Sequence, residues 1–509
     1  MKGKNRARRT LTFVVFLAAS FLPAGGVNAA EAKLSEATED CLACHGEVTP
    51  GIVSDWRRSR HSRVSLTEAL EKEPLSRRVS LPAAPEEGAG IVVGCAECHL
   101  RNAADHPDTF EHNGYNVHIV VSPADCDDCH PREREQYGEN LMANAYGNLK
   151  HNQLFGSLVH AVNGPQRFDG EAILQEPSDE LTDADSCYSC HGTVVGVKGL
   201  RSRDTAMGEM KFPVLTGWPN QGVGRINPDG TKGACTACHT RHQFSIEMAR
   251  KPYTCSQCHK GPDVPAYPVY LVSKHGNIFS ALHKEWDFGA VPWTVGKDFT
   301  APTCAACHVS LLTTEGGDVV AERSHRMNDR LSYRIFGPVY ATAHPVSPDT
   351  TIIRNKAGLP LPAELTGEPA STYLIDEAEM ASRRDRMQDV CLGCHSGQWA
   401  KGFFERLERT IETTNDTTRT ATQLVVAAWD QGLAKGPGQG DSPFNEAIER
   451  MWVAQWLFYA NSTRFASAMG GADYGVFDNG RWWLSYNIQK MKDWLDFKRG
   501  GQQEGKGKE

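Results

Sequence analysis

The sequence has no cysteine outside one repeated pattern. All 16 cysteines of the 509 residues occur in pairs with two residues between them, and every second cysteine is followed directly by histidine. A disulfide framework would not place a histidine after each pair, and zinc knuckles need closed sets of four ligands. The absence of any other cysteine therefore argues against disulfides and zinc sites as the organising feature of the chain.

Two further absences, of a large net charge and of a long apolar run, limit the classes of function that the chain can have. The formal net charge is only −8 with both signs interspersed, which argues against a nucleic-acid partner, and no long apolar run follows the first thirty residues. Residues 1–29 combine basic residues, an apolar run over 11–22 and a small-residue cleavage sequence at 27–29. This pattern predicts a signal peptide and a periplasmic mature chain; an uncleaved membrane anchor is the alternative.

The repeated pattern is the haem-attachment motif C-x-x-C-H, which occurs eight times. In this motif the two thiols add to the haem vinyl groups, and the histidine binds the iron as the proximal ligand. The sequence therefore predicts eight covalently bound c-type haems. The expected thioether residues are Cys41, Cys44, Cys95, Cys98, Cys126, Cys129, Cys187, Cys190, Cys235, Cys238, Cys255, Cys258, Cys304, Cys307, Cys391 and Cys394, and the expected proximal ligands are His45, His99, His130, His191, His239, His259, His308 and His395.

Histidines outside the motifs are candidates for the distal position on each iron. His242 lies three residues after His239 and cannot reach the same iron from the opposite face, so we expect it to bind a neighbouring haem. His112 is an alternative to His118, His160 and His283 remain open, and His106 is not expected to bind iron. The predicted distal ligands are His61, His118, His151, His242, His275, His325 and His344.

The motifs divide the chain into two parts. Residues 30–396 hold all the cysteines and histidines, with irregular spacing and glycine- and proline-containing loops between the motifs. This predicts a mainly α, haem-packed multihaem cytochrome domain of short helices and loops, in which porphyrin faces replace part of the apolar core.

Residues 397–498 lack cysteine and histidine and have longer helical patterns, so we expect a separate C-terminal module of long helices. The second of these helices should begin with Ser442 as N-cap and Pro443 in the first turn, and it should end at Gly470. Polar residues 499–509 predict a disordered tail. The three helices are expected at about 403–433, 443–469 and 481–497.

Several motifs together resemble the octahaem hydroxylamine oxidoreductases. The resemblance covers 41 to about 488 and rests on the order of the eight haem motifs and on the segments WRRSRH (56–61), CTACHTRHQFS (235–245), RKPYTC (250–255), SKHG (273–276), APTCAACH (301–308) and GADY (471–474). In that family every haem but the fourth in chain order is bis-histidine, and the fourth binds substrate. The resemblance implies that the catalytic haem is the one attached to Cys187 and Cys190, with His191 as its proximal ligand.

The resemblance also implies roles for two residues outside the haem motifs. Members that oxidise hydroxylamine or hydrazine have a tyrosine, donated by a neighbouring subunit of a trimer, bonded to the catalytic porphyrin, and Tyr474 matches it. An Asp-His pair that removes protons follows their sixth motif; here Asp263 is retained, but Val264 replaces the histidine. The alternatives are that Asp263 caps a turn and that Tyr474 is an interface or core aromatic.

The resemblance therefore implies a hydroxylamine oxidoreductase-like enzyme, of the hydroxylamine dehydrogenase class, that oxidises hydroxylamine or hydrazine. It implies catalytic roles for His191, Asp263 and Tyr474, a homotrimer, and a small redox protein or quinone-linked cytochrome as electron partner. Two alternatives remain open: a reductive member that acts on nitrite or hydroxylamine, and a non-catalytic conduit in which every iron is six-coordinate.

Overall fold

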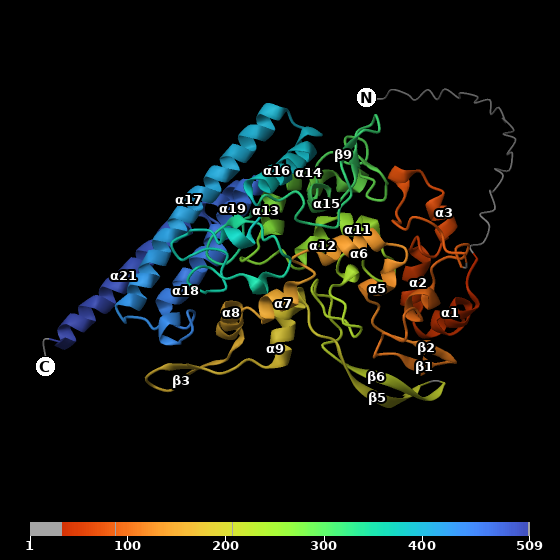
Figure 1. Cartoon of the computed structure of the whole chain (residues 1–509), viewed down its shortest axis with the longest axis horizontal. Coiled ribbons are helices and arrows are strands. Elements are labelled where there is room, and N and C mark those ends of the chain that lie inside the picture. Colours follow the sequence, from red (N-terminus) through yellow and green to blue (C-terminus); the bar gives the residue numbers. More distant parts are fainter. Residues whose placement is uncertain (1–32, 87, 206, 507–509) are drawn as a thin grey trace, which may run out of the picture.

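The computed structural model describes residues 33–86, 88–205 and 207–506. The expected signal peptide lies outside these residues. The described chain is mainly α-helical, with many short helices before residue 396 and longer helices after it (Figure 1). No helix of the described part is long and apolar enough to cross a membrane.

Short helices dominate the part of the chain that holds the haem motifs. Several motifs lie on helices of little more than one turn, and side chains cap the starts of many of these helices. Ser122, for example, accepts a hydrogen bond from the backbone of Ala124, and Pro123 follows it at the first helical position. The helices of this part are α1 (Glu36–Val48), α2 (Pro50–Arg58), α3 (Leu66–Leu70), α4 (Cys95–His99), α5 (Pro123–Asp127), α6 (Pro131–Gly138), α7 (Ala145–Lys150), α8 (Gln153–Asn163), α9 (Glu180–Asp185), α10 (Cys187–His191), α11 (Ile246–Arg250), α12 (Pro252–Ser256), α13 (Ala266–Val272), α14 (Lys274–Leu282), α15 (Cys304–His308) and α16 (Glu377–Leu392).

The strands form small separate sheets that do not build a common layer. Four are antiparallel pairs, and the fifth joins β7, β8 and β9. The pairs β3–β4 and β5–β6 project as arms from the lower edge of the view in Figure 1. The strands are β1 (Phe110–His112), β2 (Tyr115–Val117), β3 (Gln166–Phe168), β4 (Ile173–Gln175), β5 (Gly196–Thr205), β6 (Gly208–Thr216), β7 (Trp293–Thr294), β8 (Leu312–Thr313), β9 (Val319–Ala321), β10 (Tyr333–Arg334) and β11 (Thr342–Ala343).

The C-terminal part consists of long helices, of which α17 and α21 pack against each other along one side of the molecule (Figure 1). Ser396 caps α17 by accepting a hydrogen bond from the backbone of Trp399 at 3.4 Å. The helices are α17 (Gly397–Asp430), α18 (Ala447–Val453), α19 (Ala460–Met469), α20 (Ala472–Val476) and α21 (Arg481–Lys506), and a π-helical segment, Ala454–Tyr459, joins α18 to α19.

Two expectations for this part need correction. Ser442 accepts a hydrogen bond from the backbone of Phe444 in a turn, but the helix begins only at Ala447, where Glu446 and Glu449 form a capping box. The expected disordered tail from 499 is instead helical as far as Lys506, because α21 continues through it; 507–509 lie outside the described residues. The expected stop at Gly470 is confirmed, since this residue ends α19 with a left-handed backbone at φ +74°.

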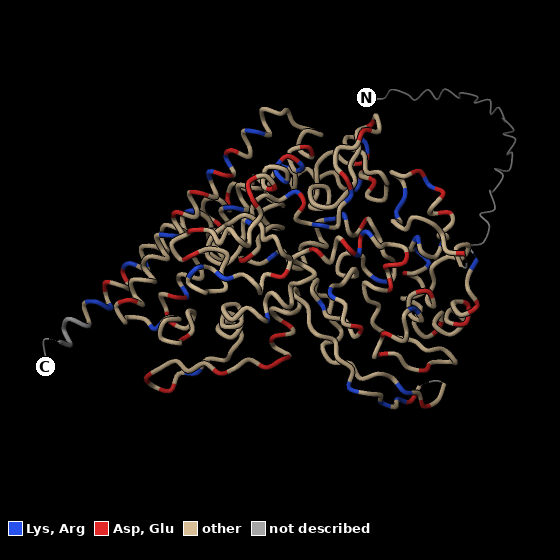
Figure 2. The backbone as a smooth tube through the Cα atoms, in the orientation of Figure 1, with Lys and Arg blue, Asp and Glu red and all other residues tan. Residues whose placement is uncertain are grey.

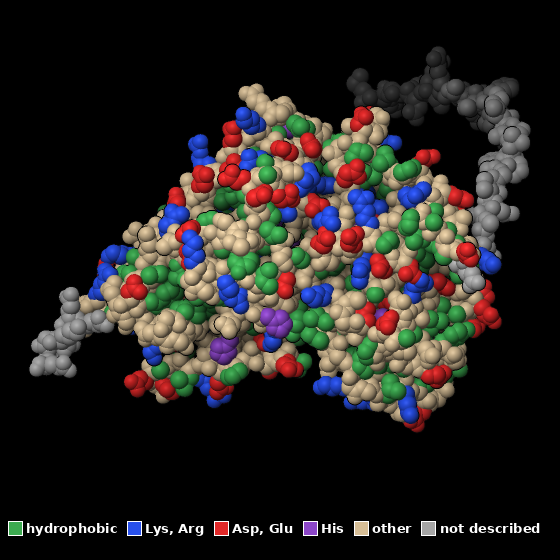
Figure 3. Space-filling model, in the orientation of Figure 1, with side chains coloured by type: hydrophobic (Ala, Val, Ile, Leu, Met, Phe, Trp, Pro, Cys, Tyr) green, Lys and Arg blue, Asp and Glu red, His purple; other side chains and the backbone are tan. Residues whose placement is uncertain are grey.

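The largest apolar cluster lies in the C-terminal part and extends beyond it. Trp452 and Trp456 are each 1% exposed at its centre, and Tyr340 and Leu361 from the preceding part of the chain pack into the same cluster. The long helices are therefore anchored on the haem-motif region. Charged residues of both signs are interspersed along the backbone (Figure 2), and few histidine side chains reach the face drawn in Figure 3.

Candidate functional site

A single connected cavity of about 2550 Å³ runs through the interior of the haem-motif region. Cysteines and histidines of most of the eight motifs line it, together with apolar side chains and arginines. These residues fit covalently attached haems, because the thiols, imidazoles and apolar surface that a porphyrin requires face the same space. The part of the chain that holds the haem motifs thus encloses the space for its cofactors.

Cysteines of different motifs meet inside the molecule. These contacts indicate which haems would be neighbours, since two porphyrins attached to adjacent thiols must lie side by side. The fourth motif contacts the sixth, because Cys190 lies beside Cys258. The thiol pairs within hydrogen-bonding reach are Cys41 with Cys95, Cys126 with Cys235, Cys190 with Cys258, and Cys255 with Cys304.

Five motif histidines each face a second imidazole at a nearly constant separation. Two imidazoles on opposite sides of one iron place their ring centroids about 6 Å apart, because each metal–nitrogen bond is about 2 Å long and the ring adds its half-width. The observed pairs match this geometry. They are His45 with His112 at 6.1 Å, His61 with His130 at 6.4 Å, His99 with His242 at 6.5 Å, His239 with His325 at 6.4 Å, and His275 with His395 at 6.1 Å.

Burial keeps several of these imidazoles in the neutral form that binds iron. Because burial disfavours the charged form, it lowers the pKa of His61, His239 and His325 to about 4 each, with smaller contributions from neighbouring histidines. A neutral ring keeps the lone pair that a metal needs. The Nδ1 atom of His45 lies 2.9 Å from the hydroxyl of Thr49, which leaves its Nε2 free to bind iron.

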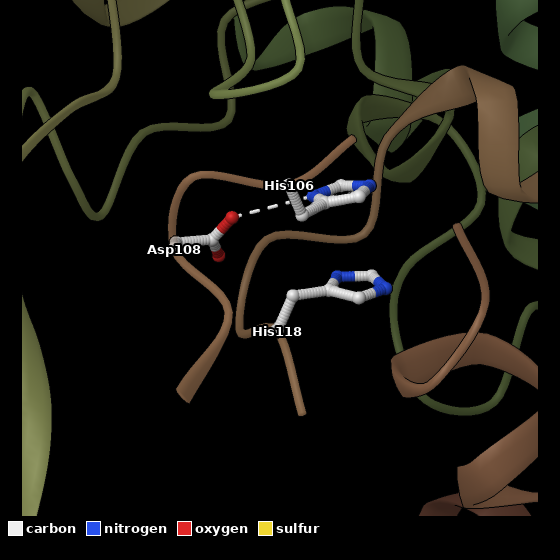
Figure 4. A group of neighbouring side chains, drawn as sticks. All are labelled: His106, Asp108 and His118. Carbon is white, nitrogen blue, oxygen red and sulfur yellow. Dashed lines mark hydrogen bonds and ion pairs between the residues drawn. The ribbon is translucent and has the colours of Figure 1, made fainter. Parts of the chain in front are cut away.

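His118, which we expected to be a distal ligand, has its ring centroid 5.9 Å from that of His99, but its other contacts differ from those of the five pairs. Its ring stacks on His106 with a centroid separation of 3.7 Å (Figure 4), and its Nε2 lies 2.9 Å from the carbonyl oxygen of Arg101. Its own carbonyl oxygen lies 2.8 Å from Nδ1 of the proximal His99. His112, rather than His118, faces His45, and nothing in the sequence spacing distinguished the two.

The His106 group resembles a metal site at first sight. Ligand atoms of His106, Asp108 and His118 lie within 4.8 Å of one another (Figure 4). However, the two nitrogens of His106 already lie 3.3 Å from carboxylate oxygens of Asp108 and Asp125, and two stacked rings direct their lone pairs along parallel planes. Hydrogen bonds to the two carboxylates outweigh the opposing effect of burial and raise the pKa of His106 to about 9. The group therefore suits a buried, protonated histidine better than a shared cation.

The other two expected distal ligands differ in their surroundings. His344 is 3% exposed, and both of its ring nitrogens lack a hydrogen-bond partner among the described residues. Burial and then the charge of Arg334 lower the pKa of His344 to about 3, and His308 is close enough to contribute. His151 is exposed and lies edge-on to Tyr146 at 6.4 Å.

His191 lies on α10, directly after the two cysteines of the fourth motif. Its Nδ1 atom is 3.4 Å from the carbonyl oxygen of Ala145. Burial lowers the pKa of His191, and Asp263 opposes this shift while Arg334 adds to it. In the described parts of the chain no second imidazole faces His191, His259 or His308 at the separation seen in the five pairs.

Asp263 and Tyr474 approach this region from different elements. The backbone carbonyl of Asp263 accepts a 2.7 Å hydrogen bond from the side chain of Asn461, and its charge acts on both His191 and Cys187. Tyr474 on α20 packs in the same apolar cluster as Val264, so the residue that replaces the family histidine and the candidate cross-linking tyrosine meet within one chain. Burial and the nearby carboxylate of Asp478 raise the pKa of Tyr474.

Three family models match parts of the chain. They are described as seven times multi-haem cytochrome CxxCH over 226–330, cytochrome c7 and related cytochrome c over 175–261, and cytochrome c554 and c-prime over 125–211. A solved structure described as a hypothetical multiheme protein is 40% identical, with a TM-score of 0.86 over 94% of this chain and 100% of that chain.

Two relatives come from Kuenenia stuttgartiensis. A probable nitrite reductase-hydroxylamine oxidoreductase fusion protein is 23% identical over 418 residues, which are 80% of this chain and 39% of that protein. This chain thus spans about two fifths of that relative. A reducing HAO-like protein complex shares the fold at 17% identity, with a TM-score of 0.60 over 93% of this chain and 87% of that chain. The chain belongs to the multihaem c-type cytochromes.

Proposed function

We propose that this oxidoreductase exchanges several electrons with a small nitrogen compound at the haem of Cys187 and Cys190, and that hydroxylamine is the compound oxidised. One observation carries the proposal: five motif histidines face a second imidazole, whereas His191, like His259 and His308, faces none among the described residues. Of these three, the resemblance selects the haem of His191 as the open one. An iron with an open position can bind a small ligand, which a bis-histidine iron cannot do without losing an imidazole.

The five facing pairs support a relay of bis-histidine haems, in which His61, His112, His242, His275 and His325 are distal ligands. His344 is placed to serve the haem of His308. The thiol contact between Cys190 and Cys258 makes the sixth haem the first stop for electrons from the catalytic one. From there the contacts of the other motifs offer routes toward both ends of the molecule.

Oxidation of hydroxylamine to nitrite consumes one water and releases four electrons and five protons, so it needs groups that accept protons. The haem supplies an iron that binds the nitrogen and accepts electrons. Asp263 is the nearby carboxylate that can take protons, because its charge already acts on His191. Val264 cannot replace the family histidine in this role, so we expect slow oxidation. Tyr474 of a neighbouring subunit is the proposed cross-linking residue, by resemblance.

The second candidate function is reduction of nitrite at the same haem. Arg334 favours it, because a guanidinium near His191 attracts an anion, and hydroxylamine carries no negative charge. Val264 favours it as well, since a site that receives protons from solvent has less need of a dedicated base. Both candidates use the same open iron and the same relay.

We also propose a homotrimer outside the cytoplasm, with a small redox protein or quinone-linked cytochrome as electron partner. Exposed aromatic residues on and beside α21 support association of the C-terminal parts, because Phe477, Trp482 and Tyr486 are 64%, 57% and 44% exposed. The motif chemistry supports the compartment, since covalent haem attachment of this kind accompanies export.

Electron paramagnetic resonance of the oxidised protein tests the open iron. We expect one high-spin haem signal that changes on adding hydroxylamine or nitrite, together with turnover of one of them. Eight low-spin haems and no ligand response would favour the non-catalytic conduit instead.

Haem-stained denaturing electrophoresis tests the tyrosine. A cross-link predicts multimers that survive boiling in the native protein and monomers in Tyr474→Phe. Tyr486→Phe is the matched control, because it changes an exposed tyrosine on α21. Monomers in the native protein, combined with efficient nitrite reduction, would select the reductive candidate.

A further inference from the structure

Arg334 is a cation of the cavity wall that has no ion-pair partner among the described residues. It lies in β10, where pairing with Thr342 of β11 fixes its register. Its side chain is half-buried and borders the internal cavity, and its buried Nε has no hydrogen-bond partner in the described part of the chain. Burial lowers its pKa to about 10, so Arg334 remains charged at neutral pH.

Buried arginines of the cavity region differ from Arg334, because the protein satisfies them. Arg330 donates to the carbonyl oxygen of Cys307 at 3.0 Å, and Arg250 donates to that of Phe288 at 2.9 Å. Arg225 bonds the side chain of Asn227 at 2.7 Å. A buried charge with neither acid nor carbonyl partner costs several kcal/mol. Arg334 differs in that its guanidinium borders the cavity with no acid or carbonyl partner among the described residues, so it is available to an anion that enters the cavity.

The surroundings of Arg334 place it at the candidate catalytic haem. Its charge acts on His191 and His344, and its guanidinium lies 5.5 Å above the ring of Phe336. Phe336 belongs to the same apolar cluster as Val264 and Tyr474. Arg334 thus lines the same cavity as residues of the fourth motif and the segment after the sixth motif.

A second arginine adds positive charge behind it. Arg464 is fully buried and donates to the carbonyl oxygen of Ile335 at 3.3 Å and to the side chain of Asn415 at 2.6 Å. Arg464 also has no carboxylate partner among the described residues, and burial lowers its pKa to about 9. Its hydrogen bonds go to neutral groups, so it holds the backbone beside Arg334 while leaving the positive charge of the site uncompensated.

We propose that Arg334 is the anion-binding residue of the catalytic site and that it selects nitrite, as substrate or as product, over neutral nitrogen compounds. This inference rests on the proposed function. The planar guanidinium can donate two parallel hydrogen bonds to the two oxygens of nitrite, and such charge-assisted bonds are stronger than bonds to a neutral ligand. A carboxylate of the catalytic haem is the other source of the same anionic chemistry.

The test compares Arg334→Gln, Arg334→Lys and Arg78→Gln with the native holoprotein. Arg78 is the matched control, because it is a half-buried arginine of the same cavity that interacts with the charges of Arg60, Asp287 and Arg323 rather than with His191. Optical titration of the oxidised protein gives Kd for nitrite and for hydroxylamine, and a redox titration gives the potential of the high-spin haem. Haem content by mass establishes that each variant is loaded.

We expect Arg334→Gln to weaken nitrite binding by about 10- to 100-fold, because it removes hydrogen bonds from a charged group. Hydroxylamine Kd should change less than about threefold, Arg334→Lys should recover part of the nitrite affinity, and Arg78→Gln should leave the ratio of the two Kd values as in the native protein. Equal nitrite affinity in Arg334→Gln and the native protein would overturn the inference. A lowered haem potential with that unchanged affinity would assign Arg334 to the haem carboxylate.

Failure of the proposed function gives a different result. If neither nitrite nor hydroxylamine perturbs a high-spin haem of the native protein, the open iron itself is absent and the whole site assignment falls. If Arg334→Gln does not take up its haems, Arg334→Lys decides, because it keeps the charge and loses the planar fork: an unchanged ratio of nitrite to hydroxylamine affinity in it would also count against the inference.

Discussion

The haem-motif region and the C-terminal helices form their interiors in different ways. The C-terminal helices contain the largest apolar cluster, with Trp452, Trp456 and Phe444 each 1% exposed. The haem-motif region, although several times longer, surrounds a cavity of about 2550 Å³ lined by thiols and imidazoles. The comparison indicates that one part folds on its own side chains, whereas the other depends on porphyrin faces to complete its core.

The largest difference between the two parts is expected when the protein is prepared without haem. We expect the apo chain to lose fixed structure through 33–396, because no apolar group would fill the cavity, while α17 and α21 keep substantial helicity. Hydrogen exchange resolved by peptide would measure both parts in one experiment. Native-like protection of the haem-motif region in the apo chain would contradict the idea that haem completes its core.

Removing a core tryptophan tests the contribution of the apolar cluster in the C-terminal part. Trp452 is 1% exposed, stacks with Phe444 and donates from its indole nitrogen to the hydroxyl of Thr422 at 2.9 Å. We expect Trp452→Ala to lower the free energy of unfolding of the C-terminal part by about 3–5 kcal/mol. Denaturant unfolding monitored by far-UV circular dichroism checks this. Trp482→Ala is the control, since its side chain is 57% exposed and its loss should cost about 1 kcal/mol or less.

The buried His106 makes the stability of the haem-motif region depend on pH. Asp108 and Asp125 hold its pKa at about 9, with Asp229 at 3.9 Å and the stacked His118 as its other titratable neighbours. Because this pKa lies above the unfolded value of about 6.5, the stabilisation is complete below about pH 6.5 and is lost as pH rises through 9.

We therefore expect the haem-motif region to lose about 1–3 kcal/mol of stability between pH 6.5 and 9.5, with unfolding followed at the haem absorption band. His106→Gln should be less stable at pH 6 and should flatten this dependence. A native pH profile that His106→Gln leaves unchanged would show that His106 is neutral in the folded protein.

The smallest expected effect is confined to one iron. His242→Ala should convert one low-spin haem to high-spin, because the ring of His242 faces His99 at 6.5 Å, and the fold should change little. Electron paramagnetic resonance would count the high-spin signals. His283→Ala is the matched control, since His283 lies 2.9 Å from the carbonyl oxygen of Phe279 and stacks on its ring instead of facing a motif histidine. Identical spectra for the two variants would remove His242 from the ligands.

The sequence by itself determined the features that depend on neighbouring residues. Haem attachment needs two thiols and a histidine within five positions, so the motif was readable eight times without a structure. The stop at Gly470 was readable for the same reason, because a left-handed glycine acts on the adjacent turn. The start of α18 was misplaced, since the capping box of Glu446 and Glu449 competed successfully with Ser442.

Only the tertiary structure decided which histidines face each other. His112 meets His45 and His242 meets His99 across long stretches of chain, and His118 stacks on His106 although it lies only six residues after His112. The setting of Arg334 was equally unreadable from the sequence, because only the folded chain places an arginine on the cavity wall without an acid beside it among the described residues. Covalent attachment is local chemistry, whereas ligand pairing and the charge of the site depend on how distant segments pack.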